Sequence, residues 1–332
     1  MTRSKYADYQ MDFYGEGKLI KELEERLADL LGKQKALFCH KGMAGQLSAI
    51  KHWAELKQNK RIAFQPRCHM HVDEQSACAK LLNLDINLVG SDQYPITIED
   101  LTQNNQLQQH PVSVLSIEIP HRRAGFLLPQ WQTLESIKAW CENSGTMLHF
   151  DGARLFEAAP HWKKSPAEVA NLSDSVYVSL YKMFGALAGG VVAADEETIE
   201  SIKPWKSRMA GDVHTLFPYA ISAMMGLDEY LPRITEFRER AIHISKLITC
   251  VLGEACVPHP VQSNSFVVTL PRSANEANKT ALAIAKNEHK WLFDSITSTA
   301  NAQCTVEIQI GDASNFWGDD EICACFEKFS PR

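Results

Sequence analysis

Residues 147–195 decide the fold, because this stretch contains two apolar runs that each end at a charged side chain. The first reads MLHFDGAR (147–154), and its apolar residues stop at Asp151. The second reads SVYVSLYKMFGALAGG (175–190), where the run ends at Lys182 and small residues follow. Both runs are typical of buried strands in a parallel sheet. Ligands of open α/β sheets bind at the carboxyl ends of the strands, so the sequence predicts a site that offers a carboxylate and an amine.

A carboxylate and a lysine at one sheet edge are what pyridoxal 5'-phosphate requires of a protein. The lysine binds the aldehyde of the cofactor covalently, and the carboxylate keeps the pyridine nitrogen protonated so that the ring accepts electrons. The lysine must also move protons, which requires a pKa lowered by burial or by nearby cations. Taken singly, Asp151 is equally well a helix N-cap and Lys182 an exposed turn residue. Together, each after an apolar run, they favour the cofactor site.

The segments DGARLFEAA (151–159) and SLYKMFGALAGGVV (179–192) resemble motifs of the threonine aldolase and aromatic amino acid β-eliminating lyase family, which are fold-type-I pyridoxal phosphate enzymes. The resemblance extends from about Tyr14 to the C-terminus and is strongest up to about residue 220. It implies an α/β, aminotransferase-like fold. We expect an N-terminal arm over residues 1–13 and a large cofactor-binding domain with interdomain helices over 14–252. This domain would hold a mostly parallel, seven-stranded sheet, and a small α+β domain would follow over 253–332.

Composition describes an ordinary globular protein of 332 residues, 45% hydrophobic and 22% charged. The net charge of −6 gives no electrostatic footprint for nucleic acid or an anionic membrane, so we expect neither as a partner. No apolar run has the length of a membrane span, and the polar start does not resemble a signal peptide. The nine cysteines show no metal-binding spacing, which predicts free thiols in a reducing cytoplasm and no metal site.

Apolar periodicity predicts alternating helices and strands up to about residue 200, the pattern of a parallel sheet covered by helices. A helical period begins at Gly17 and closes at Gly32. Another helix should open at Gly42 and run to about Leu56. After Asp195 the pattern is helical through Ile202, and Pro204 is expected to interrupt it.

The resemblance implies a phosphate-binding turn at Gly42 and Met43, where backbone N–H groups at a helix start attract an anion. His69 matches the family histidine that stacks on the cofactor ring and transfers protons, with Glu74 orienting it. His121 matches a second family histidine. A histidine, either His69 or His121, is expected to take the proton of the substrate hydroxyl.

Four further residues are carried over by the same resemblance. Arg154 would contact the cofactor phenolic oxygen or the substrate carboxylate, because a guanidinium can hold a carboxylate in two parallel hydrogen bonds. Arg122 is a candidate for the substrate carboxylate, with a solvated loop residue as the alternative. Arg208 would reach the phosphate, and Tyr14 would border the site of a neighbouring subunit. The family thus implies a homodimer or homotetramer with active sites at subunit interfaces.

The chain departs from the family pattern in the substrate half of the site. Lys41-Gly42-Met43 stands where the family has a Ser-Gly-Thr-type loop, and no Ser-Asp-Thr segment opens the chain. Glu307, in TVEIQIGDA, occupies the place of a carboxylate-binding arginine, and an acidic residue there would repel an amino-acid carboxylate.

The leading interpretation is a lyase that uses pyridoxal 5'-phosphate and cleaves a β-hydroxy-α-amino acid to glycine and an aldehyde, as threonine aldolases do. The alternative within the family is β-elimination, or other amino-acid chemistry such as transamination, on a different substrate. A pyridoxal-binding regulator is disfavoured because Asp151 and Lys182 are retained and no basic DNA-binding extension is present. An unrelated nucleotide-binding protein is disfavoured because the glycines form no G-x-G-x-x-G fingerprint.

Overall fold

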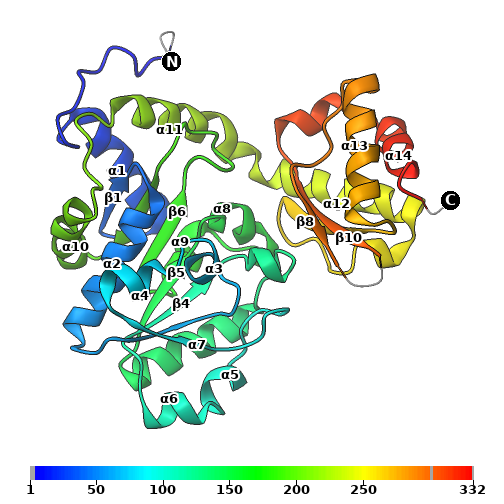
Figure 1. Cartoon of the computed structure of the whole chain (residues 1–332). Helices are drawn as coiled ribbons and strands as arrows, with labels where there is room; N and C mark the ends of the chain where they lie inside the picture. The colour runs from blue at the N-terminus through cyan, green and yellow to red at the C-terminus, as the bar shows by residue number, and fades with distance from the viewer. Residues whose placement is uncertain (1–3, 300–301, 331–332) are drawn as a thin grey trace. The chain divides into compact units, whose positions relative to one another are not determined.

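A seven-stranded sheet forms the centre of the first part of the computed structural model, which describes residues 4–299 and 302–330 (Figure 1). The order across the sheet is β1-β7-β6-β5-β4-β2-β3. Neighbouring strands are parallel from β6 to β3, and β7 runs antiparallel to both β1 and β6. The expected mostly parallel sheet is confirmed. The strands are β1 (Lys35–Cys39), β2 (Arg61–Phe64), β3 (Asp85–Leu88), β4 (Val114–Glu118), β5 (Met147–Asp151), β6 (Ser175–Ser179) and β7 (Gly190–Ala194).

The central strands read as continuous apolar runs because they are buried on both faces. Every residue of β4 and β6 is buried, as are the last four of β5. Such strands need cover on each side, and the connecting helices supply it. The longer helices are α1 (Lys18–Leu31), α2 (Gly42–Leu56), α7 (Trp131–Ser144), α10 (Glu196–Arg208) and α11 (Phe217–Tyr230). In the described part of the chain, no helix combines the length and the apolar character that crossing a membrane requires.

Short helices fill several of the strand-to-helix connections. α3 and α4 follow β2, and α8 follows β5, so each begins near the carboxyl end of a strand. α3, α6, α8 and α9 were not predicted, because four or five residues are too few to show a helical period. The short helices are α3 (His69–Val72), α4 (Ala77–Leu82), α5 (Glu99–Thr102), α6 (Asn105–Gln109), α8 (Leu155–Ala158) and α9 (Pro166–Ala170).

Pro204 does not end α10, so the expected interruption is wrong. The helix continues to Arg208 with the proline inside it. Its start is fixed by Asp195, whose side chain accepts from the N–H of Thr198 at 2.8 Å. Ile199 and Ile202 are buried in a cluster with residues of the sheet and of α2. We attribute the continuation to this packing, which outweighs the one backbone hydrogen bond that proline cannot donate.

The second compact unit is built on a three-stranded antiparallel sheet of order β8-β10-β9. Its strands are β8 (Ser265–Leu270), β9 (Ile296–Ser298) and β10 (Cys304–Gln309), and its helices are α12 (Ile234–Leu252), α13 (Ala274–Glu288) and α14 (Asp319–Glu327). The expected small α+β domain is therefore present. Glu307 lies in β10 opposite Val267 of β8.

The two units divide at Pro232 and Arg233, and residues 125–127 belong with the second unit. The composition places the boundary later, at residues 252–253. The difference is α12, whose buried residues Ala241, Ile244 and Ile248 form part of the C-terminal core cluster. A composition shift along the chain does not reveal which core a helix face joins.

Candidate active site

Charged side chains gather where three adjacent strands of the large sheet end. Glu118 closes β4 and Asp151 closes β5, and these two residues are direct partners in the parallel register. The next strand, β6, ends at Ser179, and Lys182 follows three residues later. Parallel strands place their carboxyl ends at one edge of a sheet, so the edge collects these three ionisable groups.

Asp151 is almost completely buried, with 2% of its surface exposed. Its Oδ1 accepts from the N–H of Ala153 at 3.3 Å. Its Oδ2 has no hydrogen-bond partner in the described part of the chain. A buried carboxylate oxygen without a donor costs free energy, so its persistence points to a donor supplied by a ligand. The protonated ring nitrogen of pyridoxal phosphate is such a donor, and Asp151 fits it.

Lys182 has the properties of an amine that reacts with an aldehyde. Burial, together with the nearby Arg154 guanidinium, lowers the pKa of Lys182 to about 8, against the opposing charges of Asp151, Glu157 and Glu118. A lowered pKa gives a larger neutral, nucleophilic fraction at neutral pH. Arg154 is itself 7% exposed, and it lies at the start of α8.

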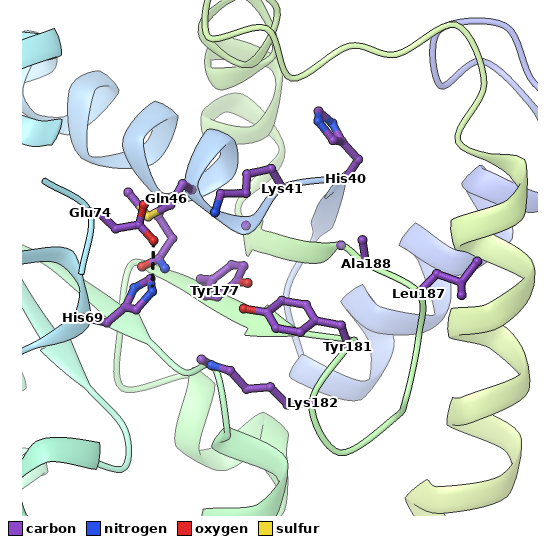
Figure 2. A pocket seen from close by; sticks show the side chains of 14 residues that line it. His40, Lys41, Gln46, His69, Glu74, Tyr177, Tyr181, Lys182, Leu187 and Ala188 are labelled. Atoms are coloured by element: carbon purple, nitrogen blue, oxygen red, sulfur yellow. Dashed lines mark ion pairs between the residues drawn. The ribbon is translucent and has the colours of Figure 1, made fainter. Parts of the chain in front are cut away.

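Lys182 lines a pocket of about 300 Å³ (Figure 2). His69, Glu74, Lys41, Gln46 and two tyrosines point into the same space from segments that lie far apart in the sequence. The full lining is His40, Lys41, Gly42, Met43, Gln46, His69, Glu74, Ala153, Tyr177, Tyr181, Lys182, Leu187, Ala188 and Gly189.

His69 is held between two carboxylates. Its Nε2 lies 3.1 Å from Glu74 Oε1 and its Nδ1 lies 3.8 Å from Asp151 Oδ2. Its backbone N–H donates to Glu118 Oε2 at 2.9 Å, which fixes the start of α3. The imidazole therefore has a defined orientation at the pocket, and the Glu74 carboxylate can stabilise a proton gained by the ring.

Glu118 ties the loops of this edge together and was not predicted as a site residue. Its Oε1 accepts from the N–H of Arg122 at 3.3 Å, and its own N–H donates to Gln65 Oε1 at 2.9 Å. Burial and the adjacent Asp151 raise the pKa of Glu118 to about 7. The rule that identified Asp151, a polar residue that closes an apolar run, would have found Glu118 as well.

The start of α2 supplies the wall at Gly42 and Met43. A Cβ on Gly42 would collide with the Tyr177 hydroxyl, so glycine is required here. Lys41 is the N-cap residue, but no side chain caps the helix. The first N–H groups of α2 therefore remain suited to an anion such as the cofactor phosphate.

His121 lies outside the pocket lining. Its side chain is fully buried, and its Nδ1 is 3.4 Å from Gln65 Nε2. Burial, with the nearby Arg67, lowers the pKa of His121 to about 4, so the ring is neutral at physiological pH. His121 is therefore a buried, neutral imidazole that does not line the pocket.

The remaining predicted residues lie at varying distances from the pocket. Arg208 is exposed, stacks on the Trp205 ring at 4.6 Å and lines a neighbouring pocket that shares His40, Lys41 and Met43 with the first. Arg122 follows β4 and contacts Glu118 through its backbone. Tyr14 is 63% exposed, and its ring meets His214 edge-on with centroids 5.5 Å apart.

Four polar residues of the lining were not predicted, namely His40, Gln46, Tyr177 and Tyr181. Tyr177 lies within β6, where it reads as an ordinary strand residue, and Tyr181 directly precedes Lys182. Gln46 lies one turn into α2 and is 1% exposed, with no partner for Oε1 in the described residues. Adjacency to Lys182 could have flagged Tyr181, whereas Tyr177 and Gln46 become site residues only through tertiary packing.

Comparison with known proteins gives consistent results. The family model described as Beta-eliminating lyase matches residues 4–271. The low-specificity L-threonine aldolase 1 of Arabidopsis thaliana is 24% identical over 247 residues, which are 71% of this chain and 67% of the relative. The low-specificity L-threonine aldolase of Candida albicans is 26% identical and covers 79% of this chain and 69% of the relative.

Among solved structures, a candidate L-allo-threonine aldolase of Listeria monocytogenes EGD-E superposes with a TM-score of 0.91 at 31% identity. The alignment covers 98% of this chain and 91% of that chain. A Leishmania major threonine aldolase, at 17% identity and a TM-score of 0.70, shares the fold.

Proposed function

Because the chain belongs to the beta-eliminating lyase family, whose cofactor is pyridoxal phosphate, we propose that it is an aldehyde-lyase acting on β-hydroxy-α-amino acids of the threonine type. The products are glycine and an aldehyde. The observation that carries this proposal is the buried Oδ2 of Asp151, without a donor of its own, at the same sheet edge as an amine of lowered pKa at Lys182.

Each residue of the edge has a distinct task. Lys182 would hold the aldehyde end of the cofactor, and its amine would be set free when the amino group of the substrate takes its place. Asp151 holds the proton on the ring nitrogen, and the bound cofactor supplies the electron sink for the pair released from the broken bond. The N–H groups at Gly42 and Met43 receive the phosphate.

His69 is the base that we assign to the substrate hydroxyl. As the Cα–Cβ bond breaks, the hydroxyl proton passes to the imidazole and the oxygen becomes the carbonyl of the aldehyde. Cα then gains one proton, which offsets the one that His69 took up and returns the imidazole to its neutral form, and the product leaves as glycine. Glu74, 3.1 Å from Nε2, stabilises the imidazolium that forms. His121 has no part in this scheme, because it is fully buried and does not line the pocket.

We also propose that the enzyme works as a homodimer or homotetramer in the cytoplasm. The aromatic side chains of Phe13 and Tyr14 are 61% and 63% exposed, which suits burial against a second copy. The nine cysteines are free thiols, which suits a reducing compartment. Light scattering of the purified protein with and without Tyr14→Ala tests the assembly.

The test of the function is a spectrum followed by product analysis. Purified protein supplied with pyridoxal phosphate should absorb near the border of the visible and ultraviolet, and borohydride should abolish the band and label Lys182. With L-threonine, L-allo-threonine or phenylserine, glycine and the matching aldehyde should appear in equal amounts. A 2-keto acid with ammonia would instead support β-elimination. Protein that takes up no cofactor, or a label on another lysine, would overturn the proposal.

A further inference from the structure

We propose that Lys41 is the cation that holds the phosphate group of the cofactor at the start of α2, in place of a hydroxyl side chain. The inference rests on the proposed function, because it concerns the same pocket. It assigns a role to a residue that the family pattern leaves open.

The pocket lining contains few positively charged side chains. Among the pocket-lining residues that the structure describes, only Lys41 and Lys182 are lysines or arginines. Lys182 is committed to the aldehyde end of the cofactor. A phosphate that carries close to two negative charges therefore finds one permanent cation in the lining, and that cation is Lys41.

Lys41 also lies at the place where a phosphate group would bind. Lys41 directly precedes the first turn of α2, and Figure 2 shows its side chain extending into the pocket above Tyr177. Its ammonium group makes no ion pair within the described residues, and its side chain is exposed. A free ammonium group beside the first N–H groups of a long helix combines a charge with the helix dipole.

The start of α2 has no side-chain cap. α9 and α13 begin with capping boxes in which Ser165 and Ser273 accept from backbone N–H groups, whereas α1, α2 and α7 begin without a side-chain cap. α2 has no such side chain, because Lys41 carries only donors. Its first turn is thus left open at a pocket, as an external anion requires.

Gln46 gives independent evidence that a ligand completes this wall. It is 1% exposed, it lines the pocket, and its Oε1 has no partner among the described residues. A buried amide oxygen in this state costs free energy until a donor from outside the chain reaches it. The start of α2 therefore faces a bound molecule rather than bulk solvent alone.

Arg208, the other cation considered for the phosphate, is engaged elsewhere in this chain. Its guanidinium stacks on Trp205 at 4.6 Å in the neighbouring pocket. Lys41 lines both pockets, and its reach into the first is visible in Figure 2.

The experiment compares the binding of pyridoxal phosphate with that of pyridoxal, which lacks the phosphate, by absorbance titration. Lys41→Met should raise the Kd for pyridoxal phosphate about 10-fold and leave the Kd for pyridoxal unchanged, as expected for loss of a charge-assisted hydrogen bond. Lys41→Arg should restore most of the affinity. Lys57→Met removes the same charge at the opposite end of α2 and should change neither Kd.

Ionic strength provides a second measurement, of which the first part uses the wild type alone. Salt should weaken the binding of pyridoxal phosphate to the wild type more than that of pyridoxal, and this difference should shrink in Lys41→Met. Equal effects on both ligands, or none, would overturn the inference. So would an unchanged Kd with a raised KM for the amino acid, because Lys41 would then bind the substrate carboxylate. Wild-type protein that binds neither ligand would instead overturn the proposed function.

Discussion

The two units of the molecule treat buried charge in opposite ways. In the first unit, several ionisable side chains are buried. The buried ones are Asp12, Glu118, His121, His149, Asp151, Arg154, Glu157 and Lys206. In the described part of the second unit, the buried polar side chains are neutral, namely Ser245, Ser263, Asn264 and Ser265. Its ion pairs, such as Arg240 with Asp319 at 3.0 Å, have partly exposed partners.

We attribute this difference in buried charge to the different demands of catalysis and of stability. Burying a charge costs free energy unless hydrogen bonds or an opposite charge offset it, so buried charges are expected where a reaction needs them. Four of the eight buried ionisable groups named above, Glu118, Asp151, Arg154 and Glu157, influence the pKa of Lys182. The second unit has an apolar core, and we expect it to contribute mainly to stability. Substitutions in the first unit should therefore lower turnover more than stability, and substitutions in the second unit should lower stability more than turnover.

The largest effect on turnover should come from Lys182→Ala. We expect turnover to fall by at least about 10⁴-fold, because the residue both binds the cofactor and moves protons. The folded-state pKa of about 8 lies below the ordinary value of 10.5, so the charged amine is disfavoured by folding at neutral pH. The cofactor-free variant should therefore unfold at the same temperature as the cofactor-free wild type, or at a higher one. Retained turnover with an unchanged spectrum would remove Lys182 from the site.

Asp151→Ala should rank second, with a loss of turnover of about 10³-fold and weaker cofactor binding. The ring nitrogen loses the carboxylate that keeps it protonated, so the absorbance of the bound cofactor should shift as well. Asp85→Ala, at the exposed start of β3, is the matched control and should behave as the wild type. Steady-state kinetics with a cofactor titration distinguishes the two variants, and equal behaviour would contradict the assignment.

His69→Phe should follow, with turnover lowered about 10²-fold. Phenylalanine keeps a flat ring at the cofactor face but cannot accept a proton. Cofactor affinity should accordingly stay within a few-fold of the wild type while the pH profile of turnover loses one ionisation. A large loss of cofactor affinity with a normal pH profile would mean that the ring only stacks.

Arg154→Gln should move the pH dependence of cofactor attachment. Arg154 lowers the pKa of Lys182, so its removal should raise that pKa. In the wild type, the rate at which Lys182 reacts with pyridoxal should rise with pH and level off above about 8. In the variant, the plateau should begin several tenths of a pH unit higher, up to about one unit. Arg123→Gln, which removes a guanidinium paired with Asp73 at 2.6 Å, should leave the plateau in place.

Phe266→Ala should have the smallest effect on turnover and a large effect on stability. Phe266 is 2% exposed in the C-terminal core, and truncation of a buried phenylalanine costs about 3–5 kcal/mol. Turnover per folded molecule should stay within about twofold. Denaturant unfolding measures the loss, and Phe316→Ala, at an 87% exposed position, should change stability by no more than about 0.5 kcal/mol. Loss of turnover at full stability would show that the second unit takes part in the chemistry.

Much of the fold was predictable because its central strands are continuous apolar runs with distinct ends. The helix predicted from Gly42 to about Leu56 has these bounds in the structure. β7 was not predicted, because Gly190–Ala194 directly follows a stretch rich in glycine and alanine that resembles a loop. The path of α10 through Pro204 was missed for a different reason. Packing of the helix face outweighed a local preference, and such packing is not visible in the order of residues.

The sequence alone indicated which cofactor this chain binds, because Asp151 and Lys182 each end an apolar run and a sheet brings such ends to one edge. Only the tertiary structure decided how those groups behave. It placed Glu118 beside Asp151, set His69 between two carboxylates and left His121 in the interior. The physical reason is that pKa values and hydrogen bonds depend on distance and burial. Both arise from contacts between residues that lie far apart in the chain.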